Sequence, residues 1–181
     1  MRVLTIAICI ILTLPGCSPN HEADAKLAGG ATATMSVRAM LGIHSDWHRK
    51  FTIGDGRASV SIDLFEDTGW WRGSNLYLHS SGTYVVHEGQ NGCFGFTLEP
   101  VSFDVRTSIS CVKVPGNALS LSDEGPALNG YPASNYYVDL FYIGRFVEAG
   151  RIPELRETRA EAPIVFQTYE QHAEPELPEI L

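Results

Sequence analysis

Basic residues are scarce in this sequence. Its 181 residues hold 13 Lys and Arg against 21 Asp and Glu, a formal net charge of −8, and the basic residues form no cluster along the chain. Nucleic-acid phosphates require grouped basic side chains, and anionic lipid surfaces attract polybasic segments. The composition therefore argues against a nucleic-acid partner and against electrostatic docking on anionic lipid.

Local signatures of catalysis and of cofactor binding are also missing. The chain has no G-x-S-x-G nucleophile elbow and neither of the Gly-rich phosphate fingerprints. We therefore expect no cofactor, and the absence of these signatures makes an enzyme the less favoured class of protein. A Ser-His-Asp triad or a carboxylate pair assembled from distant positions stays open as an alternative.

Long apolar runs are absent except for one, from Val3 to Leu14, which begins directly after Arg2. This run is too short to cross a bilayer as a helix, which needs roughly 20 residues. A positive N-terminus followed by a short apolar stretch and a small residue is typical of a secretory signal. Leu14, Gly16 and Cys17 also have the spacing of a lipobox, from which only Pro15 departs. On these residues, the segment 1–17 resembles the signal of a bacterial lipoprotein.

The resemblance implies how the protein is processed and where it is held. Residues 1–16 would be removed as a signal peptide, the thiol of Cys17 would carry a diacylglycerol, and the new N-terminus would be acylated, as with palmitate. Ser18, in place of Asp, implies the outer membrane by the enteric sorting rule, with the domain facing the periplasm. The alternative is an ordinary secretory signal cut near Gly16, which leaves Cys17 as a free thiol.

The chain has four cysteines. Cys9 lies in the apolar run that would be removed and Cys17 would be lipidated, so Cys93 and Cys111 remain. An even pair in an oxidising compartment predicts a disulfide. A flat three-stranded order would place their strands about 9 to 10 Å apart, and a disulfide requires Cα atoms roughly 4.4 to 6.8 Å apart. The bond therefore predicts a non-sequential or curved sheet.

The organisation we expect has four parts. After the signal peptide 1–16, residues 17–34 carry the lipidated Cys and a flexible tether, because they are small, polar and without apolar periodicity. Residues 35–169 form one β-rich domain, and 170–181 an acidic, Pro-rich tail expected to be disordered.

Within the domain, the three- and four-residue steps from Val37 to Trp47 predict a helix, and Pro153 to Ala162 predict another. The predicted strands are 59–65, 70–79, 83–88, 93–98, 101–106, 109–114, 136–147 and 164–169. From 59 to 114 each connection between consecutive strands is too short for a crossover helix, so these strands are predicted to form an antiparallel meander. The fold class is mainly β (α+β): an antiparallel meander sheet or a partly closed barrel, with one short helix before it and one after it.

Several residues are candidates for chemistry. On a helix, His44 and His48 would share a face as zinc ligands do, but no third ligand is apparent and no metal is expected. Trp70 and Trp71 would point to opposite faces of a strand, so at most one could line a sugar-binding surface, and packing is favoured for both. A hydrolase with a dispersed site would bring at least two residues of one set into a concave pocket: His44, His48, His79, His87, Asp63 and Asp139.

A lipidated Cys, a tether and a small disulfide-bonded β domain together are similar in architecture to periplasmic inhibitor and immunity lipoproteins. The first hypothesis is a membrane-anchored, non-enzymatic protein-binding domain with a protein partner in the periplasm. An immunity or inhibitor lipoprotein against a toxin or a cell-wall hydrolase is the alternative within this class. A periplasmic hydrolase is the alternative outside it.

Overall fold

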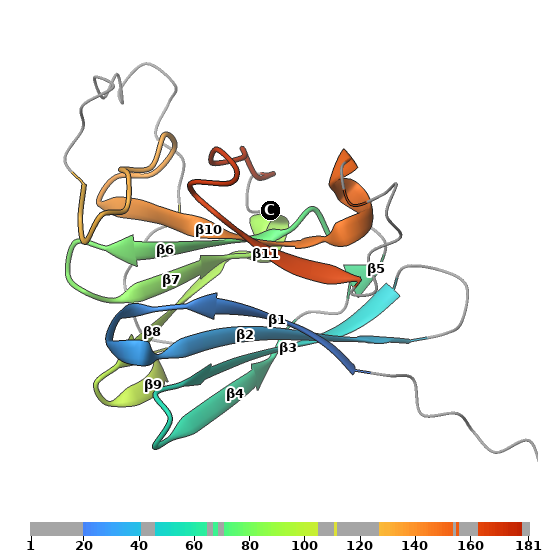
Figure 1. Ribbon diagram of the computed structural model, residues 1–181, viewed down its shortest axis with the longest axis horizontal. Helices are drawn as coiled ribbons and strands as arrows, with labels where there is room; N and C mark the ends of the chain where they lie inside the picture. The colour runs from blue at the N-terminus through green and yellow to red at the C-terminus, as the bar shows by residue number, and fades with distance from the viewer. Residues whose placement is uncertain are drawn as a thin grey trace, which may run out of the picture.

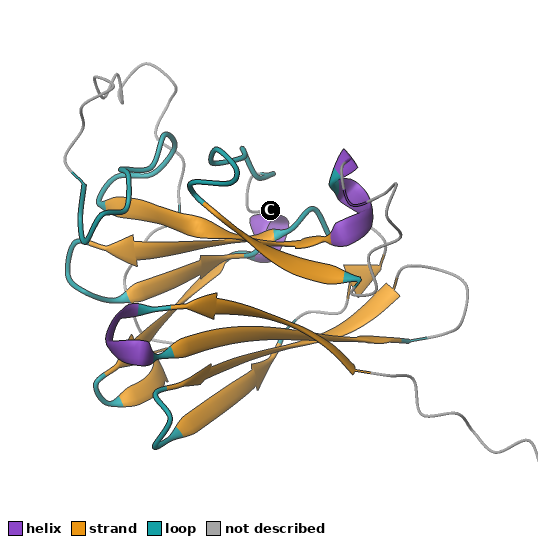
Figure 2. Ribbon diagram, in the orientation of Figure 1, coloured by secondary structure: helices purple, strands orange, loops and turns teal. Residues whose placement is uncertain are grey.

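The computed structural model describes residues 20–40, 46–64, 67–68, 71–104, 111, 127–153, 155 and 163–178. The predicted signal peptide, Cys17 and Ser18 lie outside these residues. The strands are β1 (Asn20–Lys26), β2 (Thr32–Ala39), β3 (Asp46–Gly54), β4 (Ser59–Asp63), β5 (Asp67–Thr68), β6 (Ser74–His79), β7 (Tyr84–His87), β8 (Cys93–Leu98), β9 (Val101–Asp104), β10 (Leu140–Glu148) and β11 (Ile164–Thr168). The described residues also include three short 3₁₀ turns: η1 (Ala28–Gly30), η2 (Gly89–Asn91) and η3 (Ala149–Arg151). The domain is mainly β, as predicted (Figure 2).

The strands form two antiparallel sheets packed face to face (Figure 1). Sheet A has the order β1-β2-β3-β4, with β5 paired to β3, and sheet B has the order β11-β10-β6-β7-β8-β9. At the edges of the sandwich, β1 lies beside β11 and β4 beside β9. The predicted meander, which began with the strand 59–65, is confirmed from residue 74 to residue 104 within sheet B, whereas residues 59–63 form β4 of sheet A. The arrangement is a two-sheet sandwich, not a closed barrel.

The main core lies between the sheets, where the inward-facing residues of both sheets are apolar. Phe51 of sheet A is at its centre and contacts the rings of Phe96 and Phe146 of sheet B at centroid distances of 5.7 and 5.8 Å. Met35 and Leu76 are fully buried beside them. Buried apolar side chains of this kind each contribute about 1.5 to 3 kcal/mol, so the contact between the sheets dominates the stability of the fold.

The flexible tether predicted for residues 17–34 is wrong for the part that the structure describes. Residues 20–26 form β1, with exposed residues alternating with buried Ala23 and Ala25. Alanine is depleted in strands, so composition hid a period-two pattern that is present in the sequence. The domain therefore begins no later than Asn20.

The helix predicted from Val37 to Trp47 is also wrong, because residues 36–39 belong to β2 and residues 46–47 to β3. Ala39 is the register partner of Trp47 across these two strands. The three-residue spacing that suggested a helix arose from two strands and the connection between them. The second helix, predicted for 153–162, is described only at Pro153 and Leu155, and both are helical.

The C-terminal tail is not disordered over the residues that the structure describes. Residues 169–178 cross the outer face of sheet B, where Glu174 and Leu177 are buried. We call this segment the C-terminal strap. Together with residues 127–137 and Cys111 it covers a second apolar cluster built on Tyr77 and Tyr142.

The sandwich has two unlike ends. Four hairpins, β1–β2, β3–β4, β6–β7 and β8–β9, turn at the same end, which we call the tip end and which lies at the left of Figure 1. The chain enters at the opposite end, where β1 begins at Asn20, and we call this the N-terminal end. The seven residues of β1 separate the two ends by about 20 Å.

Candidate functional site

A cleft lies at the tip end, where the four hairpins meet. It has a volume of about 610 Å³ and is lined by Ala28, Gly29, Ala31, Asp55, Arg57, Ser81, Gly82, Thr83, Tyr84, Thr97, Leu98 and Glu99. We call it the hairpin-tip cleft. Its size is within the range of about 300 to 1,000 Å³ that is usual for ligand sites.

Turn chemistry gives the cleft its shape. The Asp55 carboxylate accepts hydrogen bonds from the backbone N–H groups of Arg57 and Ala58, both at 2.8 Å, which closes the β3–β4 turn. These bonds hold the pKa of Asp55 below its usual value, so this carboxylate is charged at neutral pH. In the β6–β7 hairpin, His79 N–H donates to the Thr83 carbonyl at 2.8 Å and Gly82 has φ +88°, a left-handed conformation that glycine adopts readily in hairpin loops.

Tyr84 joins the cleft to the core. Its ring stacks on Phe96 at a centroid distance of 5.2 Å, and only 5 % of the residue is exposed. Burial raises the pKa of its phenol, so the hydroxyl stays protonated at neutral pH. The floor of the cleft is therefore fixed by packing, while its rim is made of turns.

The rim offers polar contacts from several hairpins at once. Asp55, Arg57 and Glu99 supply charges of both signs, and Ser81 and Thr83 supply hydroxyl groups. Among the described residues, neither histidine nor cysteine lines this cleft. Loops held at one end of a β-sandwich are a common place for recognition of another molecule, and this lining is suited to polar contacts with a partner.

A second hollow lies on the outer face of sheet A at the N-terminal end. It has a volume of about 500 Å³ and is lined by Asn20, Ser36, Arg38, His48, Arg49, Lys50 and Asp63. We call it the outer-face hollow. Asn20 pairs with Arg38 and Arg38 with His48 across three strands, and Lys50 pairs with Asp63.

The residues proposed for a dispersed hydrolase site are only partly brought together. His48 and Asp63 both line the outer-face hollow. His79 lies beside the β6–β7 hairpin, where its Nδ1 lies 2.7 Å from Ser81 Oγ. His87 is buried on the outer side of sheet B and its Nδ1 accepts from Gly89 N–H at 2.9 Å. His79 and His87 are not register partners, since His87 pairs with Asn75.

Of the other residues predicted as candidates for chemistry, Asp139 and Trp71 lie within the described part of the chain. Asp139 is exposed, and its carbonyl accepts from the Ser80 backbone N–H at 2.9 Å. Trp71 has the expected packing role, since it is 6 % exposed and its Nε1 donates to Ser74 Oγ at 2.9 Å. His44 and Trp70 lie outside the described residues. Because residues 46–54 form a strand, the helical basis for pairing His44 with His48 is lost.

A buried polar network holds the C-terminal strap, and the sequence did not reveal it. Glu174 accepts hydrogen bonds from Tyr77 Oη at 2.8 Å, Ser134 Oγ at 2.6 Å and Asn135 N–H at 2.6 Å. Asn75 Nδ2 donates to Tyr77 Oη at 2.9 Å. Burial raises the pKa of Glu174 more than these three bonds lower it. In the sequence, Glu174 belongs to an acidic Pro-rich run that suggested exposure to solvent.

A second buried polar contact joins the two sheets near the N-terminal end. The Arg49 guanidinium of β3 forms an ion pair with the Glu88 carboxylate just after β7, and both side chains are almost fully buried. The Arg49 guanidinium also lies 5.0 Å from the ring of Trp71. Removing one partner of such a pair is costly because a buried charge remains, so this contact is structural.

The predicted disulfide is present. Cys93 and Cys111 are bonded, with Cα atoms 6.2 Å apart. Cys93 begins β8 and pairs with His87, whereas Cys111 packs with Tyr77 and Tyr137 in the cluster on the outer face of sheet B. Cys111 is not in a strand, so the bond ties this residue on the face of the sheet to β8. The non-sequential or curved sheet that we expected from a bond between two strands therefore does not follow from it. The remaining residues of the strand predicted at 109–114 lie outside the described part of the chain.

No family model, curated protein or solved structure matches the chain. Among the described residues, no helix has the length and apolar character needed to cross a membrane. Within the same residues, no group of three or more His, Cys, Asp or Glu side chains is arranged to hold a metal ion.

Proposed function

We propose that this chain is an outer-membrane lipoprotein, anchored through Cys17, whose domain binds a protein partner in the periplasm at the hairpin-tip cleft. The observation that carries the proposal is that the start of β1 and the hairpin-tip cleft lie at opposite ends of the sandwich. The chain enters at Asn20, three residues after Cys17, and the cleft lies at the other end of β1. An anchor at Cys17 would therefore present the cleft about 20 Å away from the chain's entry into the domain, on the side that a periplasmic partner can reach.

An immunity or inhibitor role against a toxin or a cell-wall hydrolase fits within this proposal. The acidic net charge of −8 suits a basic target, mainly by steering the encounter. The rim of the cleft combines Asp55, Arg57 and Glu99, so it can form ion pairs with both basic and acidic groups of a partner.

The anchor is tested by Cys17→Ala. We expect this variant to incorporate no palmitate analogue and to leave the membrane fraction, while the wild type is labelled and fractionates with the outer membrane. An unlabelled wild type, together with a variant that still sediments with membranes, would show that the lipoprotein assignment is wrong.

The cleft is tested by site-specific photo-crosslinking in the periplasm. Crosslinkers at Arg57 and at Ser81, on two different hairpins of the cleft, should capture the same protein. The matched control is Ser61, which is exposed on the outer face of sheet A, with its Oγ 2.8 Å from Thr52 Oγ1. If Ser61 captures that protein equally well, or if Arg57 and Ser81 capture nothing, the cleft is not the partner surface.

A periplasmic hydrolase is the second candidate, favoured by one observation: His48, Asp63 and Ser36 line the same hollow. The Ser36 hydroxyl donates to Glu22 Oε1 at 3.0 Å, so a carboxylate holds the proton that a nucleophile would have to lose. A fluorophosphonate probe should label Ser36 in the folded wild type and not in His48→Ala. A folded wild type that resists labelling would remove this candidate.

A further inference from the structure

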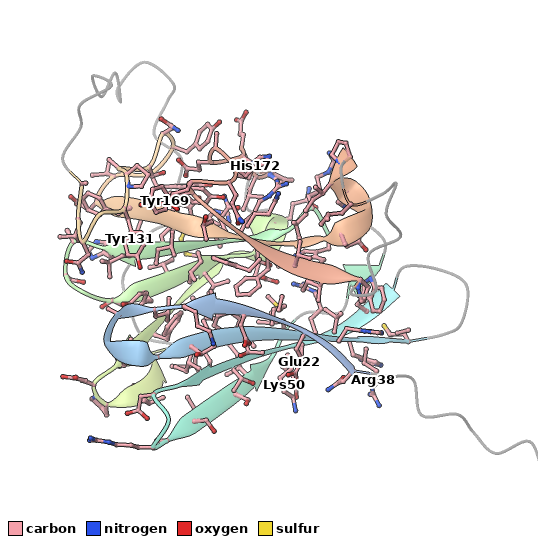
Figure 3. The ribbon with its side chains drawn as sticks, in the orientation of Figure 1. Glu22, Arg38, Lys50, Tyr131, Tyr169 and His172 are labelled. Atoms are coloured by element: carbon pink, nitrogen blue, oxygen red, sulfur yellow. A yellow bond between two sulfur atoms is a disulfide. The ribbon has the colours of Figure 1, made fainter. Side chains whose placement is uncertain are left out.

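The outer-face hollow has two cations without carboxylate partners. Arg38 and Lys50 are exposed on neighbouring strands of sheet A, and neither forms an ion pair within the described residues. Figure 3 shows both side chains on the outer side of this sheet, near Glu22. By contrast, Lys26 on the same face lies 3.6 Å from the Asp24 carboxylate.

Cations outnumber carboxylates among the lining residues; Arg49 is one of these cations, but its charge is paired with Glu88. Arg38 and Lys50 face the hollow together with His48, and Asp63 is the carboxylate among the lining residues. Glu22 lies next to the hollow, where its Oε1 accepts from the Ser36 hydroxyl at 3.0 Å. Two cations against one lining carboxylate, with polar Asn20 and Ser36 on the strands beside them, are suited to an anionic group of the size of a phosphate.

The hollow also lies close to the proposed anchor. Asn20 lines it and is three residues from Cys17, so the two Cα atoms are at most about 11 Å apart. Arg38 is the register partner of Asn20 and lies one strand further, about 5 Å away. A lipid on Cys17 would therefore bring the Arg38 and Lys50 side chains within reach of the layer of lipid phosphates.

We infer that the outer-face hollow binds the phosphate of an anionic phospholipid in the leaflet that holds the Cys17 anchor. This inference rests on the proposed lipidation. The whole chain is acidic, so the hollow cannot bring the protein to the membrane by itself; once the anchor has done so, Arg38 and Lys50 fix how the domain stands on it. The hairpin-tip cleft, at the other end of β1, is then turned away from the lipid surface.

The test couples the chain to vesicles chemically, so that it does not depend on lipidation in the cell. A chain that begins at Cys17 keeps every described residue, and with Cys93 and Cys111 bonded its one free thiol is Cys17. This thiol is joined to a maleimide lipid in vesicles with or without phosphatidylglycerol. The rates at which an amine reagent acylates Lys50 and Lys26 are then measured by mass spectrometry.

We expect phosphatidylglycerol to slow the acylation of Lys50 by about fivefold, the effect of one basic residue near an anionic surface, and to leave Lys26 unchanged. Arg38→Gln should abolish the protection of Lys50, whereas Arg57→Gln, an exposed arginine at the tip end, should preserve it. Equal protection of both lysines, or protection that survives Arg38→Gln, would overturn the inference.

A further arm separates the membrane from free anions. Inorganic phosphate, at the concentration of the lipid phosphate but without vesicles, should leave Lys50 fully reactive. Protection by inorganic phosphate alone would show that the hollow takes a free anion and would overturn docking on lipid. Loss of palmitate labelling in cells, with Lys50 still protected on coupled vesicles, would refute the lipidation and leave the chemistry of the hollow intact.

Discussion

The two outer faces of the sandwich differ in how their polar side chains find hydrogen-bond partners. The outer face of sheet A is open and polar: Thr34 donates to Asp24 at 2.7 Å and Thr52 lies 2.8 Å from Ser61, both bonds being exposed. The outer face of sheet B is covered by the C-terminal strap and residues 127–137 (Figure 1), which bury Glu174 and Tyr77. A polar group facing water needs no particular partner, whereas a buried one does.

This difference predicts where the chain tolerates change. On the covered face, the buried Tyr77 and Glu174 depend on each other although they lie far apart in the sequence. On the open face, water can replace any partner that is lost. The covered face therefore serves stability, and the open face and the hairpin tips are free to serve binding.

The largest expected effect is on the covered face. Glu174→Ala leaves three donors, Tyr77 Oη, Ser134 Oγ and Asn135 N–H, without their acceptor, and we expect the free energy of unfolding to fall by about 3 kcal/mol. The control is Glu170→Ala, which removes only an exposed bond from Tyr169 and should change stability by less than about 0.5 kcal/mol. Urea denaturation measures the free energy of unfolding of both variants. Equal losses would contradict the difference expected between buried and exposed hydrogen bonds.

Two tyrosines that are register partners on the covered face test the contribution of the buried hydrogen bonds more directly. The Tyr77 hydroxyl bridges Asn75 and Glu174, so Tyr77→Phe should cost about 1 to 2 kcal/mol. The buried Tyr142 hydroxyl has no hydrogen-bond partner among the described residues, so Tyr142→Phe should be neutral or slightly stabilising. Each variant removes one phenol oxygen. A similar loss in the free energy of unfolding in both would show that the bonds to Asn75 and Glu174 do not account for it.

The pH dependence of the covered face follows from Glu174. Burial raises the pKa of its carboxyl in the folded protein above the unfolded value. Its contribution to stability is therefore fully present below the unfolded pKa, near 4.3, and is lost as the pH rises through the folded pKa. Unfolding free energies measured between pH 7 and pH 4 should rise on acidification for the wild type relative to Glu174→Gln. A difference that stays constant with pH would refute this assignment.

The smallest effect is expected on the open face. Thr34→Ala removes the exposed bond to Asp24, and its unfolding free energy should change by less than about 0.5 kcal/mol. Thermal unfolding monitored by circular dichroism is sufficient to measure it. A loss as large as that of Tyr77→Phe would mean that the open face is as dependent on its partners as the covered one.

Sheet B was largely readable from the sequence, and sheet A was not. The strands of sheet B are rich in aromatic and β-branched residues between strong turn signals, such as Ser80 to Gly82. In β1 and β2 the inward positions include Ala23, Ala25 and Ala33, whose low strand propensity concealed the alternation. Tertiary packing against sheet B overrides that propensity.

The candidate sites were harder to predict than the strands, because their residues are distant in the sequence. Asp55, Ser81 and Glu99 meet at the hairpin-tip cleft only because four hairpins turn at one end. Arg38 and Lys50 did not form a basic cluster in the sequence, and strand pairing places them on one face. Spacing along the chain carries no information on such contacts until the register is known.

The sequence by itself determined the mainly β class, the meander from residue 74 to residue 104 and the pairing of Cys93 with Cys111, because period-two alternation, turn residues and an even cysteine count are local or countable properties. Only the tertiary structure decided that the strands divide into two packed sheets, that the strap is buried through Glu174, and that the hairpin tips and the start of β1 lie at opposite ends. These features depend on which apolar faces meet and on where buried polar groups find partners. Both are settled by contacts between residues that are remote in the chain.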